Sequence, residues 1–324
     1  MIFTIIGVVS VVGNILVLIV VRKSKELRHS QYIYKCSIAL SDIIWGLIVS
    51  AFFIWETLNA FIVYSLRESP NYKMPNIIKV ENEITYKFEL DLIYLERSLQ
   101  YDELLLLILL CPITLFVSFI TLVFAAADRY FAIAFPIRYK TTNTIKLAKI
   151  FSVIIWVIST IGYVCSVFID RDNIGYATYI LQPTPCVHVN CTASTNQTVT
   201  AAVLSTLLGL LWILTVLTLY ELYKNYKQSK KLNTIKQKGL SLEKQKALTF
   251  ALMLIAFTFS LSPTIYLHIY YYFFNESYSG VLKMRKQFFV SILFLYSNSI
   301  WNVVLYSALN QKFRKAFFKL KTSL

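Results

Sequence analysis

Long apolar runs recur along the whole chain and limit its fold more than any other feature. They lie at about 1–21, 37–62, 104–128, 148–169, 199–223, 247–274 and 287–309. A helix rises about 1.5 Å per residue, so each run can cross the roughly 30 Å hydrocarbon core of a bilayer. The chain is also 57% hydrophobic and only 15% charged, unlike a soluble domain. The sequence therefore predicts an all-α membrane protein, a bundle of seven transmembrane helices.

Basic residues indicate how the bundle is oriented. Arg22 and Lys23 follow the first run directly, and Lys and Arg are concentrated in the first, third and fifth connecting segments and in the tail. Cytoplasmic segments of membrane proteins carry this excess of positive charge. We therefore expect the N-terminus outside and the C-terminus in the cytoplasm. The net charge of +15 then belongs to a surface that faces anionic lipid and not to a nucleic-acid interface.

The segments on the predicted outer side carry three glycosylation sequons, at Asn190, Asn196 and Asn275. All three fall between spans, which supports the orientation and predicts a plasma-membrane glycoprotein. Cys186 and Cys191 share one outer segment, where a disulfide can form. They can pair with each other, or either can pair with Cys111, and the sequence leaves these alternatives open. Residues 84–92, in the long outer segment 65–103, alternate apolar and polar and predict a short strand.

A few strongly polar side chains interrupt the apolar runs. Polar groups inside a bilayer are costly and by default suggest function. Asp42 has no basic partner in any span, so its carboxylate needs hydrogen-bond donors, a cation or a proton. Asn298 and Asn302 are four residues apart and share a helix face, so they could supply donors together with Ser118. A structural role, a hydrogen bond between helices, is the alternative for these groups, Asp42 included, and it is the role we expect for Asn14.

The third run ends in Asp128-Arg129-Tyr130, within the stretch DRYFAIAFPIRY. This triplet at the cytoplasmic end of a third span resembles the rhodopsin-like family of seven-helix G-protein-coupled receptors. Other motifs of the family follow in order and on the expected spans: Gly13-Asn14, Leu40-Ser41-Asp42, Trp156, Phe257 with Pro263, and Asn302 to Tyr306. The resemblance implies a receptor that binds an extracellular ligand, a peptide or a small chemosensory molecule, and activates a heterotrimeric G protein.

The tail resembles the family's short surface helix. Phe313, Phe317 and Leu320 lie on one face from residue 310 onward, with Lys and Arg opposite, as in an interfacial amphipathic helix. We therefore divide the chain into a transmembrane receptor domain, 1–309, and a cytoplasmic amphipathic helix with a short tail, 310–324.

The resemblance also implies a mechanism. In the family the arginine of the triplet is held by its neighbouring acid and by an acid at the foot of helix six, and is released when that helix moves outward. Here these residues are Arg129, Asp128 and, by its spacing from Pro263, Glu243; the alternative for Glu243 is a solvated residue in a basic loop. Tyr130 and Tyr306 complete the predicted coupling site, and Phe257 and Pro263 form the predicted hinge.

A sodium site is the further implication of the resemblance. The polar residues of the spans fall where the family places sodium ligands and their neighbours: Asp42, Ser118, Asn298, Ser299 and Asn302. Oxygen ligands around one carboxylate suit a hard cation. No other cofactor is expected.

Departures from the family pattern narrow the ligand class. Leu261 and Val303 replace an expected tryptophan and proline, so the hinge is atypical. Cys111 stands where amine receptors carry an aspartate, and Tyr296 where opsins carry the retinal lysine, which argues against both classes.

Two other function classes remain for comparison. A transporter or ligand-gated channel is the alternative, but it would normally show paired charges or broken helices within the membrane. An intramembrane enzyme would need clusters of His, Asp or Glu within the spans, and the sequence has three His, near the membrane surfaces. We therefore expect no enzymatic activity.

Overall fold

The structure is a computed structural model of the full chain. It describes residues 2–24, 27, 29–67, 101–142, 144–169, 195–229, 234–274, 278–309 and 311–321. Within these ranges the regular elements are all helices. The strand predicted at 84–92, Cys186 and Cys191, and the sequons at Asn190 and Asn275 lie outside the described residues.

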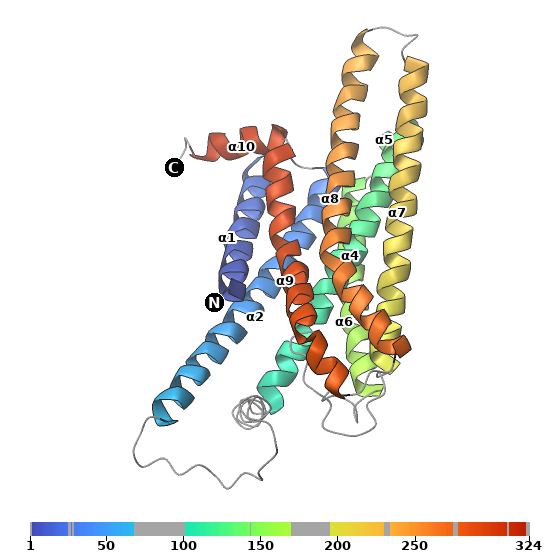
Figure 1. The fold of residues 1–324 in the computed structure, drawn as a ribbon. Coiled ribbons are helices and arrows are strands. Elements are labelled where there is room, and N and C mark those ends of the chain that lie inside the picture. Colours follow the sequence, from blue (N-terminus) through green and yellow to red (C-terminus); the bar gives the residue numbers. More distant parts are fainter. Residues whose placement is uncertain are drawn as a thin grey trace.

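Long helices, packed side by side, form the body of the molecule (Figure 1). They are α1 (Ile2–Lys23), α2 (Ser30–Arg67), α4 (Tyr101–Ala134), α6 (Thr144–Ile169), α7 (Thr195–Ser229), α8 (Thr234–Phe274) and α9 (Tyr278–Leu309). Each contains most or all of one predicted apolar run. The short helices are α5 (Pro136–Thr141), which follows α4, and α10 (Gln311–Lys321), which lies across one end of the bundle. The helical membrane fold predicted from the sequence is confirmed.

Within their described side chains, six of the long helices contain an apolar stretch long enough to cross a bilayer. In α9 the described side chains give a shorter stretch, Leu293–Leu305. Helix α9 as a whole has 32 residues, more than the roughly 20 that a span requires.

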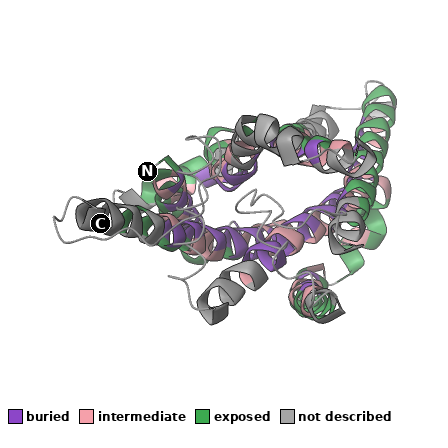
Figure 2. Cartoon of the chain, turned by 60° about the horizontal axis from the view of Figure 1, so that its bottom comes forward, coloured by how far each residue is buried: buried purple, intermediate pink, exposed green. Residues whose placement is uncertain are grey.

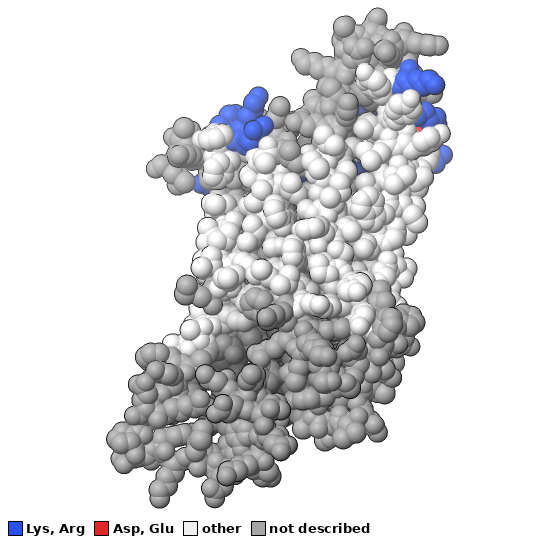
Figure 3. Space-filling model, in the orientation of Figure 1, with Lys and Arg blue, Asp and Glu red and all other residues white. Residues whose placement is uncertain are grey.

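The outer surface of the bundle is apolar. Exposed large side chains line the outward faces of the helices, including Ile5, Val8 and Val12 of α1 and Val153 and Ile158 of α6. Figure 2 shows exposed residues toward the outside and buried residues where helices face one another. In the view of Figure 3 the described Lys and Arg side chains gather at one end, above a band without charge. Such a surface fits lipid and not water.

Polar residues extend several helices beyond the predicted runs. Helix α8 begins at Thr234, well before residue 247, and α7 begins at Thr195. The expectation that Asn196 lies in a connecting loop is therefore wrong, because Asn196 belongs to the first turn of α7. A helix that leaves the hydrocarbon layer can continue in polar residues, so the limits of an apolar run do not mark its ends.

Helix α10 has the amphipathic pattern predicted for residues 310 onward. Phe313 is buried and Phe317 half-buried against the bundle, whereas Arg314, Lys315 and Lys319 are exposed. One apolar face thus attaches α10 to the bundle, and its exposed side is basic.

Candidate functional site

A carboxylate lies buried in the middle of the bundle. Asp42 of α2 is 4% exposed, and its Oδ2 accepts a hydrogen bond of 2.9 Å from Nδ2 of Asn302 in α9. These residues are 260 positions apart in sequence. The donor that the sequence predicted for Asp42 is therefore present, and it comes from one of the two asparagines proposed for this role.

Asn14 connects three helices around the same carboxylate. Its Nδ2 donates to the backbone oxygens of Ser10, at 2.9 Å, and of Ser299 in α9, at 3.3 Å. The hydroxyl of Ser10 in turn donates to the backbone oxygen of Asp42. These bonds join α1 to α2 and α9, which agrees with the structural role expected for Asn14.

The other predicted sodium ligands are buried nearby but have different bonds. Ser118 of α4 shares a short hydrogen bond with the hydroxyl of Ser41, the neighbour of Asp42. The hydroxyl of Ser299 donates to the backbone oxygen of Tyr296. Asn298 is buried as well. Among the described residues, Asn302 therefore bonds directly to the Asp42 carboxylate. Ser118 bonds instead to Ser41, the residue before Asp42 in sequence.

The donor set has the chemistry of a sodium site. In the described part of the chain no hydrogen bond reaches Oδ1 of Asp42, so this oxygen is available to a cation. Hydroxyl and amide oxygens lie on the facing helices, and no group of three or more His, Cys, Asp or Glu side chains is found among the described residues. One carboxylate with neutral oxygens suits a hard monovalent ion better than a transition metal.

A second polar cluster lies at the C-terminal end of α4. Nη2 of Arg129 lies 3.0 Å from Oδ2 of Asp128, and the two side chains are 5% and 9% exposed. An ion pair this far from water must have hydrogen bonds to compensate for the lost hydration. The surrounding residues supply them.

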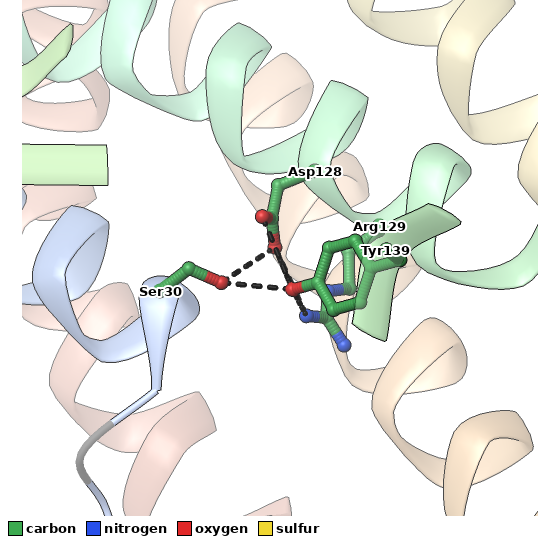
Figure 4. A network of polar contacts seen from close by, with 4 residues as sticks. All are labelled: Ser30, Asp128, Arg129 and Tyr139. Carbon is green, nitrogen blue, oxygen red and sulfur yellow. Dashed lines mark hydrogen bonds and ion pairs between the residues drawn. The ribbon is translucent and has the colours of Figure 1, made fainter. Parts of the chain in front are cut away.

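Tyr139 of α5 and Ser30 of α2 complete this cluster (Figure 4). The Tyr139 hydroxyl lies 3.2 Å from both carboxylate oxygens of Asp128 and accepts a bond of 3.4 Å from Nη2 of Arg129. The Ser30 hydroxyl lies 3.2 Å from Oδ2 of Asp128 and 2.8 Å from the Tyr139 hydroxyl. Each hydroxyl has one proton, so one of the two donates to Asp128 while the other donates to its neighbour.

Burial and the nearby Asp128 carboxylate raise the pKa of Tyr139 above its ordinary value. The phenol therefore keeps its proton at neutral pH and can act as a donor in the cluster. Neither Tyr139, which ends the stretch DRYFAIAFPIRY, nor Ser30 was among the residues predicted to be functional. The available signal was Pro136, which starts the short helix that carries Tyr139 back toward Asp128.

Comparison with known proteins identifies the fold. Residues 98–306 match the family of seven-transmembrane receptors of the rhodopsin type. The chain belongs to this receptor family. It is also similar to human melanocortin receptor 3, with 27% identity over 156 residues, which are 48% of this chain and 39% of that protein. The chain thus aligns with well under half the length of this relative.

Family membership gives the two clusters a context. The family is one of receptors and not of enzymes, and the matched residues include Asp128, Arg129 and Tyr139 as well as Asn302, the α9 partner of Asp42. The receptor's Glu243 lies in α8 and Tyr306 in α9, but their side chains are outside the described part. The predicted contact between Arg129 and Glu243 therefore stays a prediction. Tyr130 is half-buried and its ring lies near those of Phe131 and Phe135.

One disulfide alternative of the receptor is excluded. Cys111 is a free, fully buried thiol in α4, so it is not bonded to Cys186 or Cys191. A bridge between Cys186 and Cys191 stays a prediction, since both lie outside the described residues.

The predicted hinge residues lie in α8. The ring of Phe257 stacks on that of Phe119 in α4, with centroids 4.6 Å apart. Pro263 lies inside the helix and cannot donate to the backbone oxygen of Phe259, four residues before it. The hydroxyl of Ser262 donates to this oxygen instead, at 3.3 Å. The receptor thus compensates in part for the bond that its proline removes.

Proposed function

We propose that this receptor binds an extracellular ligand and activates a heterotrimeric G protein. The observation that carries the proposal is Arg129, a buried guanidinium at the predicted cytoplasmic end that is held by Asp128 and Tyr139. A charge held by contacts that a helix movement can break provides a two-position element, which a signalling receptor requires.

The surface next to this cluster suits a protein partner. Ile137 of α5 is 80% exposed, the highest exposure among the large apolar side chains described. Arg138 and Lys140 beside it are exposed and basic. An apolar side chain surrounded by cations on the cytoplasmic side fits a partner with an apolar pocket and acidic neighbours.

The proposed movement is an outward swing of the cytoplasmic half of α8. In this proposal Pro263, inside α8, would allow a bend, and the Phe257–Phe119 stack would serve as the pivot. At rest Glu243, near the cytoplasmic end of α8, would add a second carboxylate to Arg129. The swing would remove it and open space beside α4 for the G protein.

The named relative bears on the class of ligand. The similar human protein is by its name a receptor for melanocortin, but it shares only part of its length with this chain. We propose an extracellular peptide or a small chemosensory molecule as the ligand. We further propose a plasma-membrane location with the N-terminus outside, supported by the Lys and Arg residues that follow the first apolar run directly and by the described basic side chains in Figure 3.

Sodium is the ion we propose for the inner polar cluster. Asp42 would hold it through Oδ1, with Ser118, Asn298 and Ser299 as candidate oxygen ligands and Asn302 fixing the carboxylate. Bound sodium would supply positive charge that compensates the buried carboxylate, and it would favour the closed arrangement if it binds that arrangement more tightly.

A nucleotide-exchange assay tests the proposal. The full-length receptor in nanodiscs is mixed with purified G-protein heterotrimers and pools of peptides or small metabolites. We expect at least one pool to accelerate exchange, Arg129→Ala to abolish that response, and Arg314→Ala, which removes an exposed arginine of α10, to preserve it. No response from any heterotrimer, combined with ion flux through the reconstituted protein, would support the channel alternative instead.

A substitution at Glu243 tests the α8 contact separately. Glu243→Gln removes the charge with little change in shape, so we expect exchange without ligand to rise. Unchanged basal exchange at equal receptor concentration would remove Glu243 from the mechanism.

A further inference from the structure

A hydrogen bond joins α7 and α8 on the lipid-facing side of the bundle. Nε1 of Trp212 in α7 lies 3.1 Å from Oγ1 of Thr258 in α8, and Trp212 is 38% exposed. The same hydroxyl donates to the backbone oxygen of Leu254 at 2.8 Å. Thr258 therefore uses its only proton within α8 and accepts the proton of Trp212.

Water cannot replace this bond. Trp212 and Thr258 both lie near the middle of their apolar spans, Ala202–Lys227 and Ala247–Leu267. The large neighbours Ile213, Ile255 and Phe259 are exposed on the same outer surface. If the bond breaks, the indole N–H faces hydrocarbon and has no new acceptor.

We propose that Trp212 and Thr258 form a latch that holds α8 in its resting position and must open when the receptor is activated. This proposal rests on the proposed function. Its basis is the position of the bond, which is made in the same structure in which Arg129 is held by Asp128 and Tyr139.

The bond lies where a swing of α8 would break it. Thr258 is five residues from Pro263, and Ala247, at the cytoplasmic end of the span, is sixteen. At about 1.5 Å per residue these lever arms are roughly 7.5 and 24 Å. A hydrogen bond of 3.1 Å can lengthen by about 0.4 Å before it fails. A rigid swing that moves Ala247 relative to α7 by little more than about 1 Å would therefore open the latch.

Helix α7 is not free to follow α8, because its cytoplasmic half is attached to α4. Nδ2 of Asn225 donates at 3.2 Å to the backbone oxygen of Ile133, near the end of α4. Leu222 of α7 packs with Ile133 and with Ala247 of α8 in a small apolar cluster. An outward movement of α8 would separate Ala247 from this cluster, whereas the Asn225 bond would hold α7 against α4. The contact between Trp212 and Thr258 would then be stretched.

The experiment uses Trp212→Phe, Thr258→Val and the double variant. Each substitution removes one partner and keeps the approximate shape of the side chain. Spin-labelled amino acids are introduced by genetic code expansion at two exposed positions, Leu248 of α8 and Ile145 of α6. The distance between them is measured in nanodiscs without ligand or G protein, and basal nucleotide exchange is measured on the unlabelled variants.

Trp301→Phe is the matched control. Trp301 is also exposed to lipid, but its Nε1 bonds to Ser297 within α9, at 3.2 Å, and joins no two helices. The same chemical change therefore removes a bond that a swing of α8 does not strain.

We expect each single latch variant to increase the fraction of long distances about three- to tenfold, the range for one hydrogen bond between membrane helices. The double variant should add little to either single one, because both remove the same bond. Trp301→Phe should leave the distance unchanged. Basal exchange should rise in parallel with the long-distance fraction.

The outcomes separate the latch from the receptor function. An unchanged distance in the latch variants, while Glu243→Gln still raises exchange, would overturn the latch and leave the receptor function intact. A longer distance without exchange in any heterotrimer would support the latch and count against the proposed G-protein coupling. Lower thermal stability with an unchanged distance would show that the bond is only a static helix contact, which also overturns the proposal.

Discussion

At the scale of single residues, the distinctive feature of this receptor is how Arg129 is held. Its partner Asp128 is adjacent in sequence, yet Tyr139, on a separate short helix, contacts both of them. A hydrogen bond to a charged group typically contributes about 1.5–3 kcal/mol, more than a bond between neutral groups. The phenol therefore belongs to the arrangement that retains Arg129.

We predict that Tyr139→Phe raises signalling without ligand. The substitution keeps the ring and removes the hydroxyl, so Arg129 loses an acceptor and Asp128 loses one of the two hydroxyls that can donate to it. We expect basal nucleotide exchange to increase about three- to tenfold, since part of a bond of about 1.5–3 kcal/mol is recovered by water. Tyr223→Phe, on an exposed tyrosine of α7, is the control and should have no effect. Basal exchange equal to that of the unmodified receptor would show that Tyr139 does not restrain Arg129.

We predict that sodium stabilises the receptor through Asp42. An ion that binds only the folded protein, at about ten times its Kd, stabilises it by about 1.4 kcal/mol. Thermal inactivation should therefore occur at a higher temperature in sodium chloride than in choline chloride of equal ionic strength. Asp42→Asn should abolish the difference, because an amide cannot compensate the charge of a cation. A sodium effect that persists in this variant would place the ion elsewhere.

At the scale of elements, α1 and α2 pack with their backbones in close contact. A Cβ atom added to Gly46 would lie 2.8 Å from the backbone oxygen of Gly7, and one added to Gly7 would lie 2.7 Å from that of Gly46. These contacts are to backbone atoms, which cannot shift unless the whole helix moves. Small residues allow such close approach between membrane helices, where dispersion contacts replace the hydrophobic effect as the driving force.

Gly46→Ala should therefore destabilise the bundle. Overpacking typically costs about 1–3 kcal/mol, although alanine favours a helix over glycine by about 1 kcal/mol. We expect the fraction of monodisperse receptor after heating in detergent to fall at lower temperature than in the unmodified protein. Gly162→Ala in α6 is the control, because its Cβ would meet no atom within 4 Å. Equal thermal stability of the two variants would mean that the α1–α2 contact relaxes without cost.

At the scale of the whole molecule, the two polar clusters lie at different depths along the helices. Asp42 and its partners lie in the interior, and the Arg129 cluster lies at the C-terminal end of α4, next to the exposed Arg138 and Lys140 of α5. The Phe257–Phe119 stack and the bond between Trp212 and Thr258 hold α8 to two different helices. A movement of α8 can therefore change contacts in more than one layer together.

The orientation of the molecule gives the prediction at this scale. With the N-terminus outside, an epitope tag on the C-terminus should be stained only after the cells are permeabilised. Glycosidase treatment should reduce the apparent mass of the receptor, and the triple substitution Asn190→Gln, Asn196→Gln, Asn275→Gln should remove this change. Staining of the C-terminal tag on intact cells would contradict the proposed orientation, and with it the proposed cytoplasmic position of Arg129.

The sequence by itself determined the helical membrane fold and the family. Hydropathy over about 20 residues reports the fit of one segment to the bilayer, which needs no knowledge of its neighbours. Asp42 stood out for the same reason, since a polar group in an apolar run is visible locally. Arg129 stood out through the triplet Asp128-Arg129-Tyr130, which resembles the receptor family.

Only the tertiary structure decided which groups meet. Tyr139 and Ser30 are 109 positions apart, and Trp212 and Thr258 are 46 apart. Their contacts depend on the rotation and height of whole helices, which follow from packing around the entire bundle. A serine or a tryptophan in a membrane helix has many potential partners, and the folded arrangement selects one of them.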